Sequence, residues 1–108
     1  MRSPMLDRRL VPRSIFGGVA EITTIHPDTY MIVPTSELSR HGCFVRTRVI
    51  MPIGTKFGLK ITYDGKAFNA SGAVLYVLSE NGMGIRFTAT APADEELLES
   101  WLRQRTKF

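Results

Sequence analysis

The sequence predicts a small, mainly β domain, in which six antiparallel strands close into a barrel and a C-terminal α-helix follows. Between residues 17 and 88, short apolar and β-branched runs are separated by turn residues. Two of the breaks are Asp-Gly and Asn-Gly pairs, which are typical of β-hairpins. After residue 92 the apolar spacing becomes that of a helix. A barrel is favoured because closing the sheet removes its exposed edges.

The first three strands are expected at residues 18–25, 29–35 and 43–49. The first, GVAEITTI, is rich in β-branched side chains, which favour strand backbone. A His-Pro-Asp turn at residues 26–28 separates it from the second strand, TYMIVPT. Gly42 comes directly before the third, CFVRTRV.

The fourth strand, KFGLKITY at residues 56–63, alternates between apolar and polar residues. One face of this strand carries Phe57, Leu59, Ile61 and Tyr63. The Asp64-Gly65 pair that follows predicts a two-residue hairpin turn into the fifth strand.

The fifth strand is expected to be long, at residues 66–79, with Gly72 as a bend or bulge. Asn81-Gly82 predicts a second hairpin turn, leading into a sixth strand at residues 83–88. Ile85 and Phe87 then lie on one face of that strand.

The segment PADEELLESWLRQR, residues 92–105, predicts an amphipathic helix. Pro92 suits the first helical turn, and Glu99 and Arg103 are spaced to form an ion pair within the helix. The apolar face is expected to pack on the sheet or to plug one end of the barrel. This face consists of Leu97, Leu98, Trp101 and Leu102.

Length and composition favour one globular domain that resides in the cytoplasm. The chain has 108 residues, of which 44% are hydrophobic and 22% charged. It has one cysteine, so no internal disulfide is expected, and neither a membrane-spanning apolar run nor a signal peptide is evident. We divide the chain into a flexible arginine-rich loop at residues 1–16 and the barrel with its helix at residues 17–108.

Basic charge is concentrated at the N-terminus in the stretch DRRLVPRS, residues 7–14. Arg8, Arg9 and Arg13 surround Pro12, and Asp7 is the one acidic residue nearby. Guanidinium groups this close repel one another unless an anion lies between them. Arginine also offers a planar fork of donors that matches phosphate and guanine acceptors. The stretch therefore indicates an anionic ligand, with a solvated basic tail as the plainer alternative.

No enzyme or metal site is predicted. Cys43 and His41 are close in sequence, but a catalytic pair also needs an orienting group and an oxyanion site. A zinc site would need further ligands, and the only other candidate is His26, which is distant in sequence. Cys43 is therefore interpreted as a buried strand residue. The glycines near residue 83 lack the Lys-Ser or Lys-Thr of a phosphate-binding loop.

A second informative stretch is SELSRHGCFVRT, residues 36–47. Its polar turn, Ser39 to Gly42, lies between two expected strands, and Gly42 suggests either a positive φ or a close backbone approach. Glu37 and Arg40 add a carboxylate and a guanidinium. Taken alone, the stretch is an ordinary strand-to-strand turn.

The two stretches together resemble the PilZ domain family, which carries an RxxxR motif followed by a [D/N]xSxxG motif at a strand junction. The first motif matches Arg9 to Arg13, preceded by Arg8, and the second matches Glu37 to Gly42. The motif spacing, the six-strand pattern, the closing GMGIRFT and the terminal helix are also similar. The resemblance extends from residue 7 to about residue 103.

The resemblance implies a β-barrel of PilZ type that binds cyclic di-GMP and uses no metal or further cofactor. Ser39 and Gly42 would shape the floor of the site, and the residue at position 37 would accept hydrogen bonds from a guanine edge. The arginines would clamp phosphate and base, with Arg8 helping to hold a stacked pair of ligand molecules. The implied ligand-binding residues are Arg8, Arg9, Arg13, Glu37, Ser39, Arg40 and Gly42.

Glu37 departs from the family pattern, which has Asp or Asn at this position. The additional methylene predicts weaker binding or a shifted base. A protein adaptor of PilZ type that does not bind cyclic di-GMP is therefore the alternative. A barrel for single-stranded nucleic acid would need exposed stacking aromatics. The strand phases instead assign Phe57, Phe87, Tyr63 and Tyr76 to core or hairpin packing.

If the chain is a receptor, ligand binding should order the arginine loop on the barrel and present a changed surface to an unidentified downstream protein. The chain length favours a stand-alone receptor. We expect no DNA, RNA or membrane insertion among its interactions, and the oligomeric state is left open.

Overall fold

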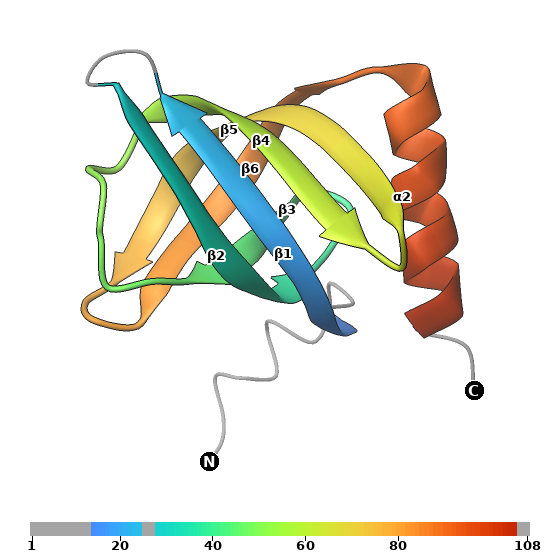
Figure 1. Ribbon diagram of the computed structural model, residues 1–108, viewed down its shortest axis with the longest axis horizontal. Helices are drawn as coiled ribbons and strands as arrows, with labels where there is room; N and C mark the ends of the chain where they lie inside the picture. The colour runs from blue at the N-terminus through green and yellow to red at the C-terminus, as the bar shows by residue number, and fades with distance from the viewer. Residues whose placement is uncertain (1–13, 25–27, 106–108) are drawn as a thin grey trace.

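The computed structural model describes residues 14–24 and 28–105 (Figure 1). Six antiparallel strands form a closed barrel in the order β1-β2-β3-β6-β5-β4, and helix α2 follows the last strand. The predicted fold class is confirmed. The elements are β1 (Ser14–Thr24), β2 (Thr29–Leu38), β3 (Gly42–Arg46), β4 (Lys56–Tyr63), β5 (Lys66–Leu78), β6 (Gly82–Thr90) and α2 (Pro92–Arg105).

The three strands nearest the motifs differ from their predicted ends. β2 ends at Leu38, three residues after its predicted end. β1 begins at Ser14 rather than near Gly17, because Ser14 pairs with Leu38 of β2 and the next residue pairs with Glu37. The side chain of Phe16 is buried, so the barrel includes residues that we had assigned to the N-terminal loop.

β3 ends at Arg46, three residues before its predicted end. The hydroxyl of Thr47 accepts a hydrogen bond from the N–H of Val49 at 2.9 Å, which turns the chain locally. The N–H of Thr47 donates to the carbonyl of Asn81, so the chain leaves β3 toward the β5–β6 turn.

The Asp64-Gly65 hairpin is confirmed, because both residues have positive φ (54° and 76°), as a type I′ turn requires. The second hairpin is shifted from its prediction. Its turn occupies residues 79–81, where Glu80 rather than Asn81 takes the positive φ, and Gly82 already belongs to β6. The predicted irregularity at Gly72 is confirmed by a register shift between Ser71 and Gly72.

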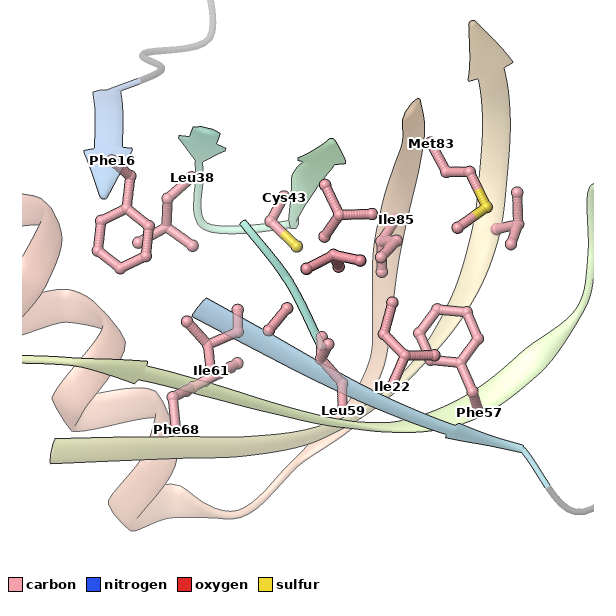
Figure 2. Close-up of a cluster of buried hydrophobic side chains, with 14 of the residues drawn as sticks. Phe16, Ile22, Leu38, Cys43, Phe57, Leu59, Ile61, Phe68, Met83 and Ile85 are labelled. Atoms are coloured by element: carbon pink, nitrogen blue, oxygen red, sulfur yellow. The ribbon is translucent and has the colours of Figure 1, made fainter. Parts of the chain in front are cut away.

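The barrel interior is filled by apolar side chains that come from all six strands (Figure 2). The strand β4 follows the predicted pattern, since Phe57, Leu59 and Ile61 are buried between exposed neighbours. The largest fully buried apolar side chains include Phe68, Ile22, Leu38, Ile61 and Met83.

Helix α2 packs against one end of the barrel through the predicted apolar face. Trp101 is 2% exposed, and its ring centroid lies 5.5 Å from that of Phe16 and 5.6 Å from that of Tyr63. Leu98 is buried beside it. The helix therefore covers the barrel end at which β1 begins and β4 passes into β5 (Figure 1).

Candidate functional site

A cavity of about 140 Å³ lies on the outer surface of the barrel, over β2, β3, β6 and β5. Its lining comes from residues 37–39 and 41–44, from Leu75 and Tyr76 of β5, and from residues 84–86 of β6. The strand junction that carries the second sequence motif therefore forms part of its wall.

The cavity lining includes a row of residues that pair across four adjacent strands. Glu37 of β2 is opposite Phe44 of β3, Phe44 is opposite Gly84 of β6, and Gly84 is opposite Tyr76 of β5. Side chains in such a row point to the same face of a sheet. A carboxylate and two aromatic rings thus share the outer face.

The glycine in this row makes room for an aromatic side chain. A Cβ at Gly84 would collide with the ring of Tyr76, so Tyr76 lies directly over the β6 backbone. The Phe44 ring covers Gly82 in the same way and stacks beside Tyr76, with a centroid distance of 6.2 Å. Phe44 and Tyr76 form an outer aromatic pair. We had predicted core or hairpin packing for Tyr76.

Two β-bulges give Glu37 and Tyr76 their outward orientation. The β2–β3 register shifts between Thr35 and Glu37, and the β5–β6 register shifts between Val74 and Tyr76. Thr35 and Val74 are both buried, so strict alternation would also have turned the residues two positions later inward. The extra residue in each bulge reverses that phase.

The Ser39–Gly42 turn is held by local hydrogen bonds. The N–H of Ser39 donates to the carbonyl of Gly42 at 2.9 Å, and the hydroxyl of Ser39 accepts from the N–H of His41 at 3.3 Å. A Cβ at Gly42 would fall on the carbonyl oxygen of Ile85. The close approach predicted for Gly42 is confirmed, and it is what lets β3 lie tightly against β6.

Arg40, at the tip of the same turn, forms an ion pair with helix α2. Its guanidinium contacts the carboxylate of Glu99 through two nitrogens, at 3.2 and 3.3 Å. The helical spacing predicts an ion pair between Glu99 and Arg103. Glu99 pairs with Arg40 instead. The pair ties the motif turn to the helix, and Arg40 is not among the residues that line the cavity.

Of the seven predicted ligand-binding residues, the structure brings Glu37, Ser39 and Gly42 to one cavity. Arg40 lies in the same turn but is paired with the helix. Arg8, Arg9 and Arg13 fall outside the described residues.

Arg86 contributes a cation to the cavity wall, although no sequence motif marks it. It pairs with Gly42 across β3 and β6, and it is exposed. Strand alternation could have predicted the outward orientation of Arg86, because it lies between Ile85 and Phe87, which the sequence assigns to the opposite face. Alternation could not have predicted the orientation of Leu75 and Tyr76, because a bulge sets it.

Cys43 is a buried residue of β3, in agreement with its interpretation as a structural side chain. Burial raises the pKa of its thiol to about 12, which keeps it uncharged and unreactive at neutral pH. Within residues 14–24 and 28–105, no cluster of three or more His, Cys, Asp or Glu side chains is suited to hold a metal ion. In the same part of the chain, no helix has the length and apolarity needed to span a bilayer.

A family model described as the PilZ domain matches residues 7–104. No curated protein matches the chain. Among solved structures, the chain is similar to the inhibitor of motility MotI/DgrA of Bacillus subtilis, with a TM-score of 0.74 and 16% identity. The match covers 97% of this chain and 51% of that one, so the chain spans about half the length of MotI/DgrA.

Two isolated PilZ domains are similar over nearly their whole length. The PilZ domain of Escherichia coli YcgR, solved with c-di-GMP, gives a TM-score of 0.69 at 14% identity, covering 91% of each chain. The PilZ domain of CeSA from a cellulose-synthesizing bacterium gives 0.67 at 14% identity, covering 86% of this chain and 96% of that one. At these identities the likeness establishes a shared fold.

Proposed function

The chain belongs to the PilZ domain family, a family of receptor and adaptor domains, and from that premise we propose that it is a receptor for cyclic di-GMP. One observation carries the proposal. Glu37, Ser39 and Gly42 of the second motif lie at one outer cavity, together with the cation Arg86 and the ring of Tyr76.

The chemistry of this cavity suits part of a guanine dinucleotide. The Glu37 carboxylate can accept hydrogen bonds from the N–H groups of a guanine, and Tyr76 and Phe44 offer aromatic surface to its ring. Arg86 supplies fork-shaped donors for a phosphate or for guanine acceptors. A cavity of about 140 Å³ is smaller than the roughly 300–1,000 Å³ of a typical ligand pocket, so most of the ligand must be bound elsewhere.

We propose that the remaining contacts come from Arg8, Arg9 and Arg13. These arginines would clamp the phosphates and bases that extend beyond the cavity, and Pro12 would limit the backbone entropy lost on binding. Closure of this segment over the ligand would change the surface offered to a downstream protein. Arg40 would hold the motif turn through Glu99 or turn toward the ligand.

Titration calorimetry with cyclic di-GMP tests the proposal. We expect the full chain to bind, and we expect Arg9→Ala and Arg13→Ala each to weaken binding by about 1–3 kcal/mol, roughly ten- to a hundredfold in Kd. Arg86→Ala should weaken it about tenfold through the cavity itself. The matched control is Arg103→Ala, which removes an equal charge from α2, outside the cavity lining, and should leave Kd unchanged.

Equal affinities across the wild type and these arginine variants would contradict the proposed clamp. The same titration reports stoichiometry, and a value near one ligand per chain would contradict the role of Arg8 in holding a stacked pair. Glu37→Asp, which restores the residue type of the family motif, should bind more tightly than the wild type.

The second candidate function is a PilZ-type adaptor that does not bind the nucleotide, and Glu37 is the observation that favours it. In that case the unmodified chain would give no heat of binding with cyclic di-GMP. A partner protein would then associate with it in the absence of nucleotide.

A further inference from the structure

The motif turn, residues 39–42, is joined to helix α2 by one ion pair. The Nε atom and one terminal nitrogen of the Arg40 guanidinium contact the two carboxylate oxygens of Glu99, at 3.2 and 3.3 Å. Such a bidentate contact uses the same fork of donors through which arginine binds a phosphate. While Arg40 is paired with Glu99, this edge of its guanidinium is not available to another anion.

The backbone of Arg40 lies beside the cavity, although its side chain does not line it. Its chain neighbours Ser39 and His41 both contribute to the lining. Consecutive Cα atoms are about 3.8 Å apart, so Arg40 begins one residue away from the cavity wall on either side. Its side chain is 68% exposed, which leaves it room to rotate. The position of the guanidinium therefore depends on which anion it pairs with.

The cavity wall carries no net charge. The ionised side chains among its lining residues are Glu37 and Arg86, which cancel when His41 is neutral. A ligand with two phosphates is therefore bound more tightly if a further cation reaches the wall. Within the motif turn, Arg40 is the residue with a fixed positive charge.

We propose that Glu99 of α2 competes with the ligand for Arg40, and that this competition links nucleotide binding to the helix. In the free chain, Glu99 holds the guanidinium away from the cavity. When cyclic di-GMP occupies the cavity, Arg40 leaves Glu99 and pairs with a phosphate of the ligand. The inference rests on the proposed function, because it requires a ligand that carries phosphate at this cavity.

The exchange of partners costs little because the ion pair is exposed. The two side chains are 68% and 41% exposed, and exposed pairs of this kind change an equilibrium by about fivefold at most. A phosphate offers Arg40 the same bidentate geometry as the carboxylate that it leaves. Glu99 should therefore raise the Kd for the nucleotide severalfold without preventing binding.

The same exchange changes the surface of α2. The helix carries Glu95, Glu96 and Glu99 in its first half, and loss of Arg40 leaves the Glu99 carboxylate without its cation. Coupling between two binding events is reciprocal. A downstream protein that pairs a basic side chain with Glu99 would therefore strengthen nucleotide binding by the same factor by which the nucleotide strengthens the association of that protein.

Titration calorimetry of Glu99→Gln with cyclic di-GMP tests the competition. This substitution removes the charge but keeps the size of the side chain, and we expect it to lower Kd about three- to fivefold. The matched control is Glu96→Gln, which removes the same charge from an exposed position one turn earlier on α2. Its Kd should stay within about twofold of the wild type, since Glu96 is not the partner of Arg40.

A double-mutant cycle shows whether the gain depends on Arg40. In an Arg40→Ala chain, adding Glu99→Gln should change Kd no more than the Glu96→Gln control does, because there is no guanidinium to release. Backbone amide signals give a second readout. Saturating nucleotide should shift the amide signals around Glu99 in the wild type, and these shifts should be absent in Arg40→Ala.

The inference is overturned if the wild type binds the nucleotide and Glu99→Gln binds it equally or more weakly. It is also overturned if the gain persists in the Arg40→Ala chain, or if the amides around Glu99 shift to the same extent in that variant. A wild type that binds no cyclic di-GMP would give a different result, because it would overturn the proposed function and the competition together.

Discussion

Thr35 carries its hydroxyl into the interior of the barrel, where it is 1% exposed and has no hydrogen-bond partner among the described residues. It lies opposite Gly18 and Val45, beside the bulge that turns Glu37 outward. A buried hydroxyl without a partner costs about 1–3 kcal/mol, so this residue weakens the core that surrounds it.

Thr35→Val should leave the free energy of unfolding unchanged or raise it by about 1 kcal/mol, because it replaces an unpaired hydroxyl with a methyl group of similar size. Urea denaturation measures the change. Thr24→Val is the matched control: Thr24 is also buried, but its hydroxyl accepts a hydrogen bond from the N–H of Thr29 at 3.1 Å. The free energy of unfolding of this control should fall by about 1–2 kcal/mol. Equal losses in the two variants would show that Thr35 has a partner after all.

At the scale of the elements, β3 and β5 place two aromatic side chains over β6, on the outside of the barrel. Gly82 and Gly84 of β6 lie beneath the rings of Phe44 and Tyr76, and the bulge near Leu75 brings Tyr76 onto this face. Glycine in the interior of a strand normally destabilises the strand. Here the missing side chains let the rings cover the backbone and form one wall of the candidate site.

Gly84→Ala should lower the free energy of unfolding by about 1–3 kcal/mol, because the new methyl group collides with the Tyr76 ring and forces it outward. The control is Gly17→Ala in β1, where a Cβ would meet no atom within 4 Å and stability should change by less than about 0.5 kcal/mol. Thermal or urea unfolding of the pair distinguishes a packing collision from a general effect of losing glycine. A Gly84→Ala variant as stable as Gly17→Ala would contradict the close contact.

At the scale of the whole molecule, helix α2 packs onto one end of the barrel. Trp101 contacts aromatic rings from β1, β4 and β5, so a single side chain links the helix to the first and middle parts of the chain. The Arg40–Glu99 pair adds a second link, but it is exposed (68% and 41% of the two side chains) and contributes little in water.

Trp101→Ala should lower the free energy of unfolding by about 3–5 kcal/mol, since it leaves a large cavity beneath the helix. Glu99→Ala on the same helix removes only the surface ion pair and should cost less than about 1 kcal/mol. Urea denaturation with circular dichroism compares the two variants. A small loss for Trp101→Ala would mean that the helix is not an integral part of the barrel.

The sequence by itself determined the strands, the Asp64-Gly65 hairpin, the helix with its buried face, and the family motif at residues 37–42. Alternation, turn preference and helical spacing are local properties, so each can be read from neighbouring residues. These properties located β4 and α2 to the residue. The family resemblance at residues 37–42, and not a local pattern, pointed to three of the residues that meet at the cavity.

Only the tertiary structure decided which way several of those residues face and which partners they take. The bulges in β2 and β5 reverse the strand phase, so Glu37 and Tyr76 point outward where alternation alone would turn them inward. Arg40 pairs with Glu99, which is 59 positions away along the chain. These features depend on how distant strands register against one another, and no local pattern carries that information.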